Sequence, residues 1–319
     1  MKILISTDLE GCAGIFHREL QISNPTPQEW AKTLRVCTGE FVAAIEGAWA
    51  GGATEIWIHA AHDVDVEMLP PGVQVIRGLR LWDEVIYQGE SFDALVVVGQ
   101  HGGGHLVDCA LAHTCLPSWQ IEASTGSQQG WLRQIAPQIG ELRAGEFSTV
   151  RKVWLNGRLC GETSLIMAFA AGFGVPTACV CGDSHACAEA QELAPQAEVV
   201  PVKWGVHFRA ARMLSPAGAR EAIRSGVERA INRLPEIPLM PDGPQEIKIQ
   251  YVHPERADRS ARWPGVRRED AHTLSATAPS GREIAALQFL FARPADALDG
   301  PTDLENYDPP DWLKQGAGE

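Results

Sequence analysis

The sequence predicts an α/β fold: a parallel-rich sheet with flanking helices, plus a smaller α+β part at the carboxyl end. Short apolar, β-branched runs without polar alternation recur through the first hundred residues. Such runs are typical of strands buried on both faces of a parallel sheet. Helix-like stretches separate them, and this alternation is typical of a parallel sheet covered by helices. From about residue 201 the pattern changes to mixed strands and helices.

Length, composition and charge limit the classes of protein that this chain can belong to. It has 319 residues, 45% of them hydrophobic, and a net charge of −13. A chain of this size buries a sizeable core, and its acidity predicts no nucleic acid and no membrane as partners. No run is long enough to cross a membrane and no cleavable leader is evident, so we expect a cytoplasmic protein. The eight cysteines lack metal-knuckle spacing and are expected to be free thiols.

The first strand, expected over residues 2–6, ends in two carboxylates, Asp8 and Glu10, followed by Gly11 and Gly14. In open α/β sheets, ligands bind beyond the carboxyl ends of the strands. Two acids this close repel each other, so a proton or a cation must offset their charge. The alternative is a polar loop whose acids cap the next helix.

The elements expected after this strand alternate in type up to about residue 200. Helical apolar spacing predicts a helix over residues 29–49, and Gly51 and Gly52 mark its end. Asn156 and Gly157 predict a hairpin-type turn. Further strands are expected at residues 55–59, 73–76, 94–98, 152–155 and 176–181, and further helices at 162–172 and 186–193.

The remaining segments complete the predicted domain organisation. Residues 119–147 are rich in Gln, Gly, Ser and Ala, and we expect an insertion that covers or flanks the site. Beyond residue 200 we expect a strand to residue 204, a helix at 216–234, a strand at 246–252 and a helix at 284–291. The predicted domains are a metal-binding α/β catalytic domain over 1–200 with the insertion 119–147, an α+β domain over 201–293, and an acidic, proline-rich tail over 294–319.

Two later strands are each followed by a histidine: His62 follows the strand at 55–59, and His101 follows the strand at 94–98. Right-handed crossovers place these strand ends on the edge that carries Asp8 and Glu10. The alternative for each histidine taken singly is a hydrogen-bonded loop residue.

Glu162 adds a third carboxylate at a helix start, and His113 follows the glycine-rich stretch after His101. The three carboxylates, with the two imidazoles of His62 and His101, suit a borderline divalent ion. Zn²⁺ is the first choice, and Mn²⁺ or Co²⁺ also fits. Five such groups suit two ions bridged by a carboxylate, which together can activate a hydroxide and polarise a carbonyl. For Glu162 alone, the alternative is an acid that favours the helix dipole.

The order of these motifs along the chain resembles the zinc-dependent D-aminopeptidase family, over roughly residues 1–118 and 150–293. The main motifs are Asp8-Leu9-Glu10-Gly11 with Gly14, Ala61-His62, Gly99-Gln100-His101, Ala112-His113-Thr114 and Asn156-Gly157-x-x-x-Gly161-Glu162. Further matches are Arg35-x-x-Thr38-x-Glu40, Val175-Pro176, Gly182-Asp183 and Leu214-Ser215-Pro216.

The resemblance implies a dinuclear zinc aminopeptidase or amide hydrolase that acts on small peptides or aminoacyl amides, D-configured ones among them. It implies that His113 is catalytic, as an acid/base or oxyanion stabiliser, and that the protein forms homo-oligomeric rings, pentamers or decamers. The chain departs from the family's pattern at Ala60, where an Asp is usual, and at Cys12, where an aliphatic residue is usual. The implied ligands of two zinc ions per chain are Asp8 as the bridge, Glu10, His62, His101 and Glu162.

A serine hydrolase is the alternative function. The loop 101–104 resembles the oxyanion-hole motif of lipases and esterases, and residues 182–186 resemble a nucleophile elbow around Ser184. The elbow's last glycine is alanine here, and this alternative leaves the acids after the first strand unexplained. The triad would be completed by His253 or His272 with Asp258 or Asp270.

A non-enzymatic alternative uses the glycines at 102–104 as a phosphate-binding loop in a nucleotide-binding module. The sequence lacks the Lys-Ser/Thr pair of a P-loop and any dinucleotide fingerprint, so this alternative ranks below the other two. Bound metal would distinguish the zinc enzyme from both alternatives.

Overall fold

The structure is a computed structural model of the chain and describes residues 1–77, 89–114, 150–263, 265–284 and 287. The predicted insertion at 119–147 and the predicted tail at 294–319 therefore lie outside the described residues. Of the helix expected at 284–291, only Ile284 and Leu287 are described.

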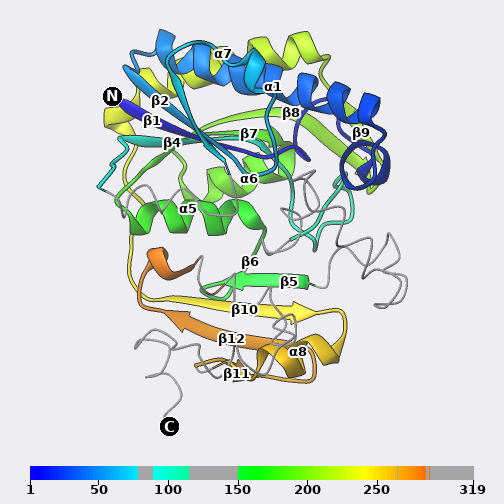
Figure 1. The fold of residues 1–319 in the computed structure, drawn as a ribbon. Coiled ribbons are helices and arrows are strands. Elements are labelled where there is room, and N and C mark those ends of the chain that lie inside the picture. The colour runs from blue at the N-terminus through cyan, green and yellow to red at the C-terminus, as the bar shows by residue number, and fades with distance from the viewer. Residues whose placement is uncertain (78–88, 115–149, 264, 285–286, 288–319) are drawn as a thin grey trace.

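The predicted parallel-rich sheet is present as a seven-stranded sheet in the order β3-β2-β1-β4-β7-β8-β9 (Figure 1). Neighbouring strands pair in parallel except β8 and β9, which are antiparallel. The strands are β1 (Lys2–Thr7), β2 (Glu55–Ala60), β3 (Val73–Arg77), β4 (Ala94–Gln100), β7 (Thr177–Asp183), β8 (Glu198–His207) and β9 (Ala210–Met213).

Helices cover both faces of this sheet, as the apolar runs predict. The helices α1 (Pro27–Ala50) and α7 (Pro216–Asn232) lie on one face, and α5 (Glu162–Gly172) and α6 (Ser184–Leu193) lie on the other (Figure 1). Successive side chains of a strand point to opposite faces. Ile3 and Ile5 of β1 therefore pack in the core under α1 and α7, while Leu4 packs in the core that includes α5. A strand covered on both faces needs apolar residues at consecutive positions.

Capping fixes the start of α1 two residues before the predicted position. The side chain of Thr26 accepts a hydrogen bond from the amide of Glu29, and Pro27 occupies the first turn. Proline is favourable there because its missing N–H has no partner in the first turn of a helix. The helix α7 begins in the same way, with Ser215 accepting from the amide of Gly218.

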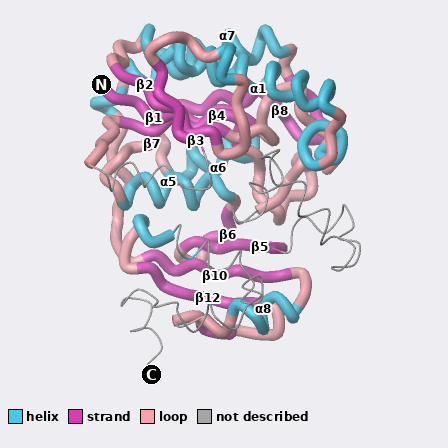
Figure 2. Tube along the Cα trace, viewed as in Figure 1, coloured by secondary structure: helices cyan, strands magenta, loops and turns pink. Residues whose placement is uncertain are grey.

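A second, five-stranded antiparallel sheet lies below the first in the view of Figure 2, in the order β11-β12-β10-β5-β6. Asn156 and Gly157 have φ of 51° and 79°, the left-handed values that a type I′ hairpin turn requires between β5 and β6. The elements are β5 (Val150–Leu155), β6 (Arg158–Cys160), β10 (Gln245–Tyr251), α8 (Pro254–Ser260), β11 (Arg267–Arg268) and β12 (Thr273–Ala278). Single-turn helices occur at Glu19–Ser23, Val66–Met68, Leu234–Glu236 and Gly281–Glu283.

The predicted fold class is confirmed, and the sheets show how the chain is distributed between its two parts. The strands β8 and β9 and the helix α7 belong to the first sheet and its layers, although they lie beyond residue 200. The hairpin β5–β6 belongs to the second sheet, although it precedes residue 200. The domain boundary at 200 stays a prediction. In the described part of the chain, no helix is both long and apolar enough to cross a membrane.

Candidate metal centre

The carboxyl ends of β1 and β4 approach each other closely because two glycines leave room for the backbone. Gly99 has a φ of 80°, and a Cβ there would collide with the carbonyl oxygen of Asp8. A Cβ on Gly11 would collide with the carbonyl oxygen of Gln100. The amide of Asp8 donates to the carbonyl of Val98 at 2.8 Å, which extends the pairing past the end of β1. This approach places the acids after β1 beside the histidine after β4.

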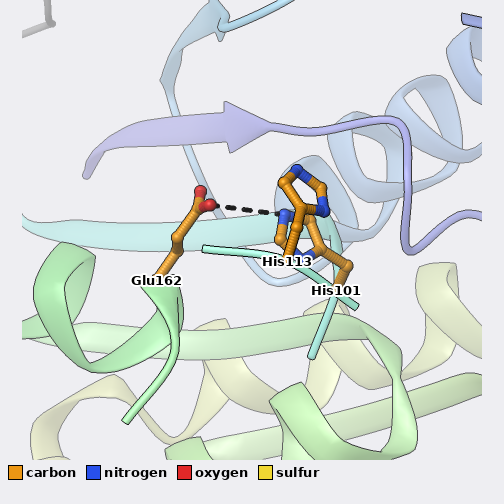
Figure 3. A group of neighbouring side chains, drawn as sticks. All are labelled: His101, His113 and Glu162. Carbon is orange, nitrogen blue, oxygen red and sulfur yellow. Dashed lines mark ion pairs between the residues drawn. The ribbon is translucent and has the colours of Figure 1, made fainter. Parts of the chain in front are cut away.

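The five predicted ligands lie together at this edge of the sheet. The Nε2 atom of His62 lies 3.0 Å from Oδ1 of Asp8 and 3.2 Å from Oε2 of Glu10. The Nε2 atom of His101 lies 3.4 Å from Oδ2 of Asp8 and 3.6 Å from Oε1 of Glu162, and Figure 3 shows the latter pair. The two oxygens of Asp8 therefore face different imidazoles, and each imidazole has a second carboxylate of its own.

His113 lies in the same cluster. Its ring stacks on that of His101, with centroids 3.9 Å apart and planes 11° apart (Figure 3). Its Nε2 atom lies 3.9 Å from Oε1 of Glu10, and its Nδ1 atom lies 2.7 Å from the carbonyl oxygen of Leu111. A carbonyl only accepts, so Nδ1 carries the proton and Nε2 of the neutral ring carries the lone pair. Leu111 has a φ of 61°, a costly conformation for a branched residue, and its carbonyl fixes the His113 ring.

The cluster is buried and rich in negative charge. Glu10 is 0% exposed, and neither of its carboxylate oxygens accepts a hydrogen bond from a described residue. Burial and the neighbouring Glu10 raise the pKa of Asp8. Burial alone would lower the pKa of His62, but the charge of Glu10 and the contact with Asp8 raise it well above its usual value. Arg18 places Nη1 3.9 Å from Oε1 of Glu10 and offsets one negative charge. Because the cluster holds three carboxylates, and buried carboxylates are costly without a compensating charge, it still favours a bound cation.

The donor set fits divalent ions. His101 places Nδ1 at 3.0 Å from the carbonyl oxygen of Gly102, which leaves Nε2 directed at the carboxylates, the orientation typical of a metal-ligating histidine. Burial lowers the pKa of this ring, but the charges of Glu162 and Asp8 raise it overall. Two groups of donors each have ligand atoms within 4.8 Å of one another: Asp8, Glu10 and His62, and His101, His113 and Glu162. Nitrogen and carboxylate donors suit Zn²⁺, Mn²⁺ or Co²⁺.

Burial and the charge of His101 hold the pKa of His113 well below its usual value. Its ligand atom lies within 4.8 Å of those of His101 and Glu162, so both coordination and catalysis are open to this residue.

Two residues that support the cluster were not predicted from the sequence. Lys203 of β8 is fully buried and donates to the carbonyl oxygens of Glu10 and, at 3.2 Å, Ile15, which holds the loop after β1. Glu189 of α6 accepts from the amides of Gly161 at 3.0 Å and Ser164 at 2.8 Å, which fixes the start of the helix that carries Glu162. A lysine inside an apolar strand was a visible signal for Lys203, whereas nothing around Glu189 indicated its role.

Glu40 of α1 supports the same loop, and it gives a pH-dependent prediction. Its Oε1 atom accepts from the amide of Ala13 at 2.8 Å, and burial raises its pKa to about 8. The folded state therefore holds this proton more firmly than the unfolded chain does, so the contribution of Glu40 to stability falls as pH rises from about 4.5 to about 8. We expect Glu40→Gln to match the wild type near pH 5 and to exceed its free energy of unfolding near pH 8, by up to about 4 kcal/mol.

Urea unfolding of the metal-free protein at both pH values measures this difference, because removing the metal removes the pH dependence of metal binding. Parallel pH profiles of the wild type and Glu40→Gln would show that Glu40 does not change its charge in this range.

The serine triad predicted as the alternative is not assembled in the described part of the chain. Ser184 is the first residue of α6, after β7, so the strand-to-helix context of the elbow is present. No described imidazole forms a hydrogen bond with its hydroxyl. His272 instead places Nδ1 at 3.2 Å from the carbonyl oxygen of Tyr251, at the second sheet. Asp183 caps α6 by accepting from the amide of His185 at 2.9 Å.

Comparison with known proteins identifies relatives of this chain. The sequence model of the peptidase M55 family, described as D-aminopeptidase, matches residues 1–123 and 145–289. A D-aminopeptidase of Bacillus subtilis (strain 168) is 24% identical over 271 residues, which cover 83% of this chain and 86% of that protein.

A solved structure also has the same fold: the zinc-dependent D-aminopeptidase DppA from Bacillus subtilis, described as a self-compartmentalizing protease. It superposes with a TM-score of 0.75 at 21% identity, covering 92% of this chain and 98% of that one. The family match extends over both sheets and includes every residue of the cluster described above. This chain belongs to the peptidase M55 family of D-aminopeptidases.

Proposed function

We propose that this protein hydrolyses small peptides or aminoacyl amides at a centre of two zinc ions bridged by Asp8. One observation carries the proposal: Asp8 directs one carboxylate oxygen at His62 and the other at His101. Membership of a D-aminopeptidase family supports the hydrolytic activity. The zinc dependence of the solved relative, together with the nitrogen and carboxylate donors here, supports zinc as the metal.

The proposed ligands divide into two sets that share Asp8. Glu10 and His62 complete the set on one side, and His101 and Glu162 complete the set on the other. When bound, a pair of ions of this kind lowers the pKa of water and stabilises negative charge on a carbonyl oxygen. Each set would supply three protein donors to an ion, which would leave coordination positions for water and substrate.

His113 is proposed as the catalytic residue of the centre. Hydrolysis of an amide requires a proton for the leaving nitrogen and stabilisation of charge on the carbonyl oxygen. Because Nδ1 of His113 is bound to the carbonyl of Leu111, Nε2 is the atom that can take up and deliver a proton. The stacking on His101 keeps that nitrogen among the proposed ligands.

The experiment that tests this function compares paired D- and L-aminoacyl amides and dipeptides with the zinc-loaded protein. We expect hydrolysis of the D-configured member of each pair to exceed that of the L-configured one, to stop on chelation and to return with added Zn²⁺. Activity that survives exhaustive chelation, or no hydrolysis of any pair, would contradict the proposal.

A serine hydrolase would respond in the opposite way to chelation and to substitution of Ser184. We expect Ser184→Ala to retain the wild-type rate, because no described imidazole forms a hydrogen bond with its hydroxyl and because Asp183 is engaged as a helix cap. Rates measured with and without chelator on both proteins distinguish the mechanisms. A serine enzyme would lose its activity on substitution and keep it in chelator.

We also propose a homo-oligomeric ring, a pentamer or a decamer. The solved relative is described as self-compartmentalizing. Five exposed apolar side chains, on the segments after β1 and β4 and near the β8–β9 turn, support an interface, since exposed apolar surface often marks one. Arg209 forms an ion pair with Glu19 at 3.1 Å, which joins the segment of Phe16 and Leu20 to the segment of Val206 and Phe208. The five are Phe16, Leu20, Val107, Val206 and Phe208.

Light scattering at micromolar concentration tests the assembly. We expect a mass of about five or ten times the 34.6 kDa of one chain. A mass equal to that of one chain would refute the ring.

A further inference from the structure

A second cluster of metal-binding side chains lies outside the proposed two-zinc centre. It consists of Cys109, from the segment after β4, with Asp183 and His185 at the β7–α6 junction. One ligand atom from each lies within 4.8 Å of the others. The proposed catalytic function uses none of the three. Two of them belong to the stretch 182–186 that the sequence analysis singled out as a nucleophile elbow.

Asp183 is the buried anion of this cluster. The residue is 0% exposed, and its Oδ1 atom accepts from the amide of His185 at 2.9 Å. Its Oδ2 atom accepts no hydrogen bond from any described residue. An oxygen of a buried carboxylate that lacks a partner carries a desolvation cost, which a bound cation would offset.

The imidazole of His185 lies between two carboxylates. Its Nδ1 atom lies 3.2 Å from Oδ1 of Asp183, and its Nε2 atom lies 3.3 Å from Oδ1 of Asp108. When Nε2 carries the proton and donates it to Asp108, Nδ1 is unprotonated. The lone pair of Nδ1 then points toward Asp183. A carboxylate bound to the outer nitrogen is the usual partner of a metal-ligating histidine.

Cys109 supplies the third donor. Its thiol is 0% exposed, and burial together with Asp183 raises its pKa to about 12. A thiol that is hidden and protonated is unsuited to attack a substrate, which argues against a Cys-His-Asp nucleophile. A set of sulfur, nitrogen and oxygen donors suits zinc, whose binding releases the thiol proton.

We propose that Cys109, Asp183 and His185 bind a third divalent ion of the zinc class, separate from the two-ion centre, with Asp108 orienting His185. On binding, a sulfur–metal bond replaces the S–H bond of Cys109 and the proton passes to solvent. The ion enters from the side of Asp108, whose side chain is 69% exposed, against 28% for His185.

The third ion would stabilise the loop of residues 101–113, which begins at His101 and ends at His113. A Cβ on Gly102 would lie 2.6 Å from Sγ of Cys109 and 3.2 Å from Cβ of His185, so the cluster lies directly against the residue after His101. The amide of His113 donates to the carbonyl of Gly102 at 3.3 Å. A metal at this position therefore clamps the segment that carries His101 and His113 to the start of α6.

The test uses Co²⁺ alone as a probe, titrated into the full-length, metal-free protein. We expect three ions per chain, with a near-ultraviolet thiolate-to-cobalt charge-transfer band that belongs to one of them. The two-ion centre has only nitrogen and oxygen donors and gives no such band. No thiolate band at saturating Co²⁺ would overturn the proposal.

Matched variants locate the band. Cys109→Ser should lose the band and one ion, while the control Cys187→Ser, a buried thiol of α6 that donates to the carbonyl of Val180, should keep both. His185→Gln, on the partly exposed side, should also lose the band. Asp108→Asn should keep it at saturation but weaken the binding of that ion about 10- to 100-fold. A band that persists in Cys109→Ser and His185→Gln, or disappears in Cys187→Ser, would overturn the proposal.

The test also separates this site from the proposed function. Asp8→Ala should retain the thiolate band with one ion per chain. If the two-ion centre were wrong and this site right, the ion count of the wild type would fall below three while the band and its dependence on Cys109 remained.

Discussion

The Asp8→Ala variant is expected to lose both ions of the proposed centre and, with them, its hydrolytic activity. Among the described residues, Asp8 is the one carboxylate that faces both His62 and His101, so its removal leaves two of the proposed ligands for each ion. Elemental analysis of protein purified without chelator measures the occupancy, and hydrolysis of the preferred aminoacyl amide measures the activity.

Asp63→Ala is the matched control for this substitution. Asp63 directly follows His62 in the loop after β2, but its carboxylate forms an ion pair with Arg77 and none with the imidazole of His62 or His101. We expect this variant to keep both ions. Full metal occupancy in Asp8→Ala would show that no bridge exists at Asp8.

The His113→Ala variant is expected to lower turnover by about 10²- to 10⁴-fold, the usual contribution of a general acid or base, with metal content unchanged. The physical reason is the loss of Nε2, the ring nitrogen that lies among the proposed ligands. Turnover at saturating substrate and elemental analysis on the same preparation give the two quantities.

Two further variants separate catalysis from packing at this position. His113→Phe keeps a ring that can stack on His101 but lacks the nitrogen, so it should be as slow as His113→Ala. His105→Ala removes a histidine of the same loop that lies outside the cluster and should leave turnover unchanged. Loss of metal from His113→Ala would make His113 a ligand, and wild-type turnover would make it a structural residue.

The first sheet could be predicted from the sequence because its strands are buried on both faces. Consecutive apolar residues such as Ile3, Leu4 and Ile5 are needed there, and they leave an unmistakable local pattern. Right-handed crossover connections then bring the strand ends to one edge, which is why Asp8 and His101 could be placed together from the sequence alone. The hairpin at Asn156 was predictable because its turn demands left-handed backbone angles.

The remaining features depend on contacts between residues far apart in the chain. The hairpin β5–β6 pairs with β10, about ninety residues later, and nothing in its own sequence names that partner. Lys203 supports the loop after β1 from a strand almost two hundred residues away. Cys109 approaches Asp183 only because the segment after β4 and the start of α6 meet. Composition and periodicity report local structure and burial, so they cannot reveal such pairs.

The most direct test of the account is the anomalous scattering of zinc in a crystal of the zinc-loaded protein. In addition to the separate peak expected at Cys109, Asp183 and His185, we expect two peaks about 3.5–4 Å apart, the separation usual for two-metal sites, with Asp8 between them. One peak should lie beside Glu10 and His62, and the other beside His101 and Glu162. A single peak beside Asp8, or two peaks that do not share Asp8, would contradict the two-ion centre.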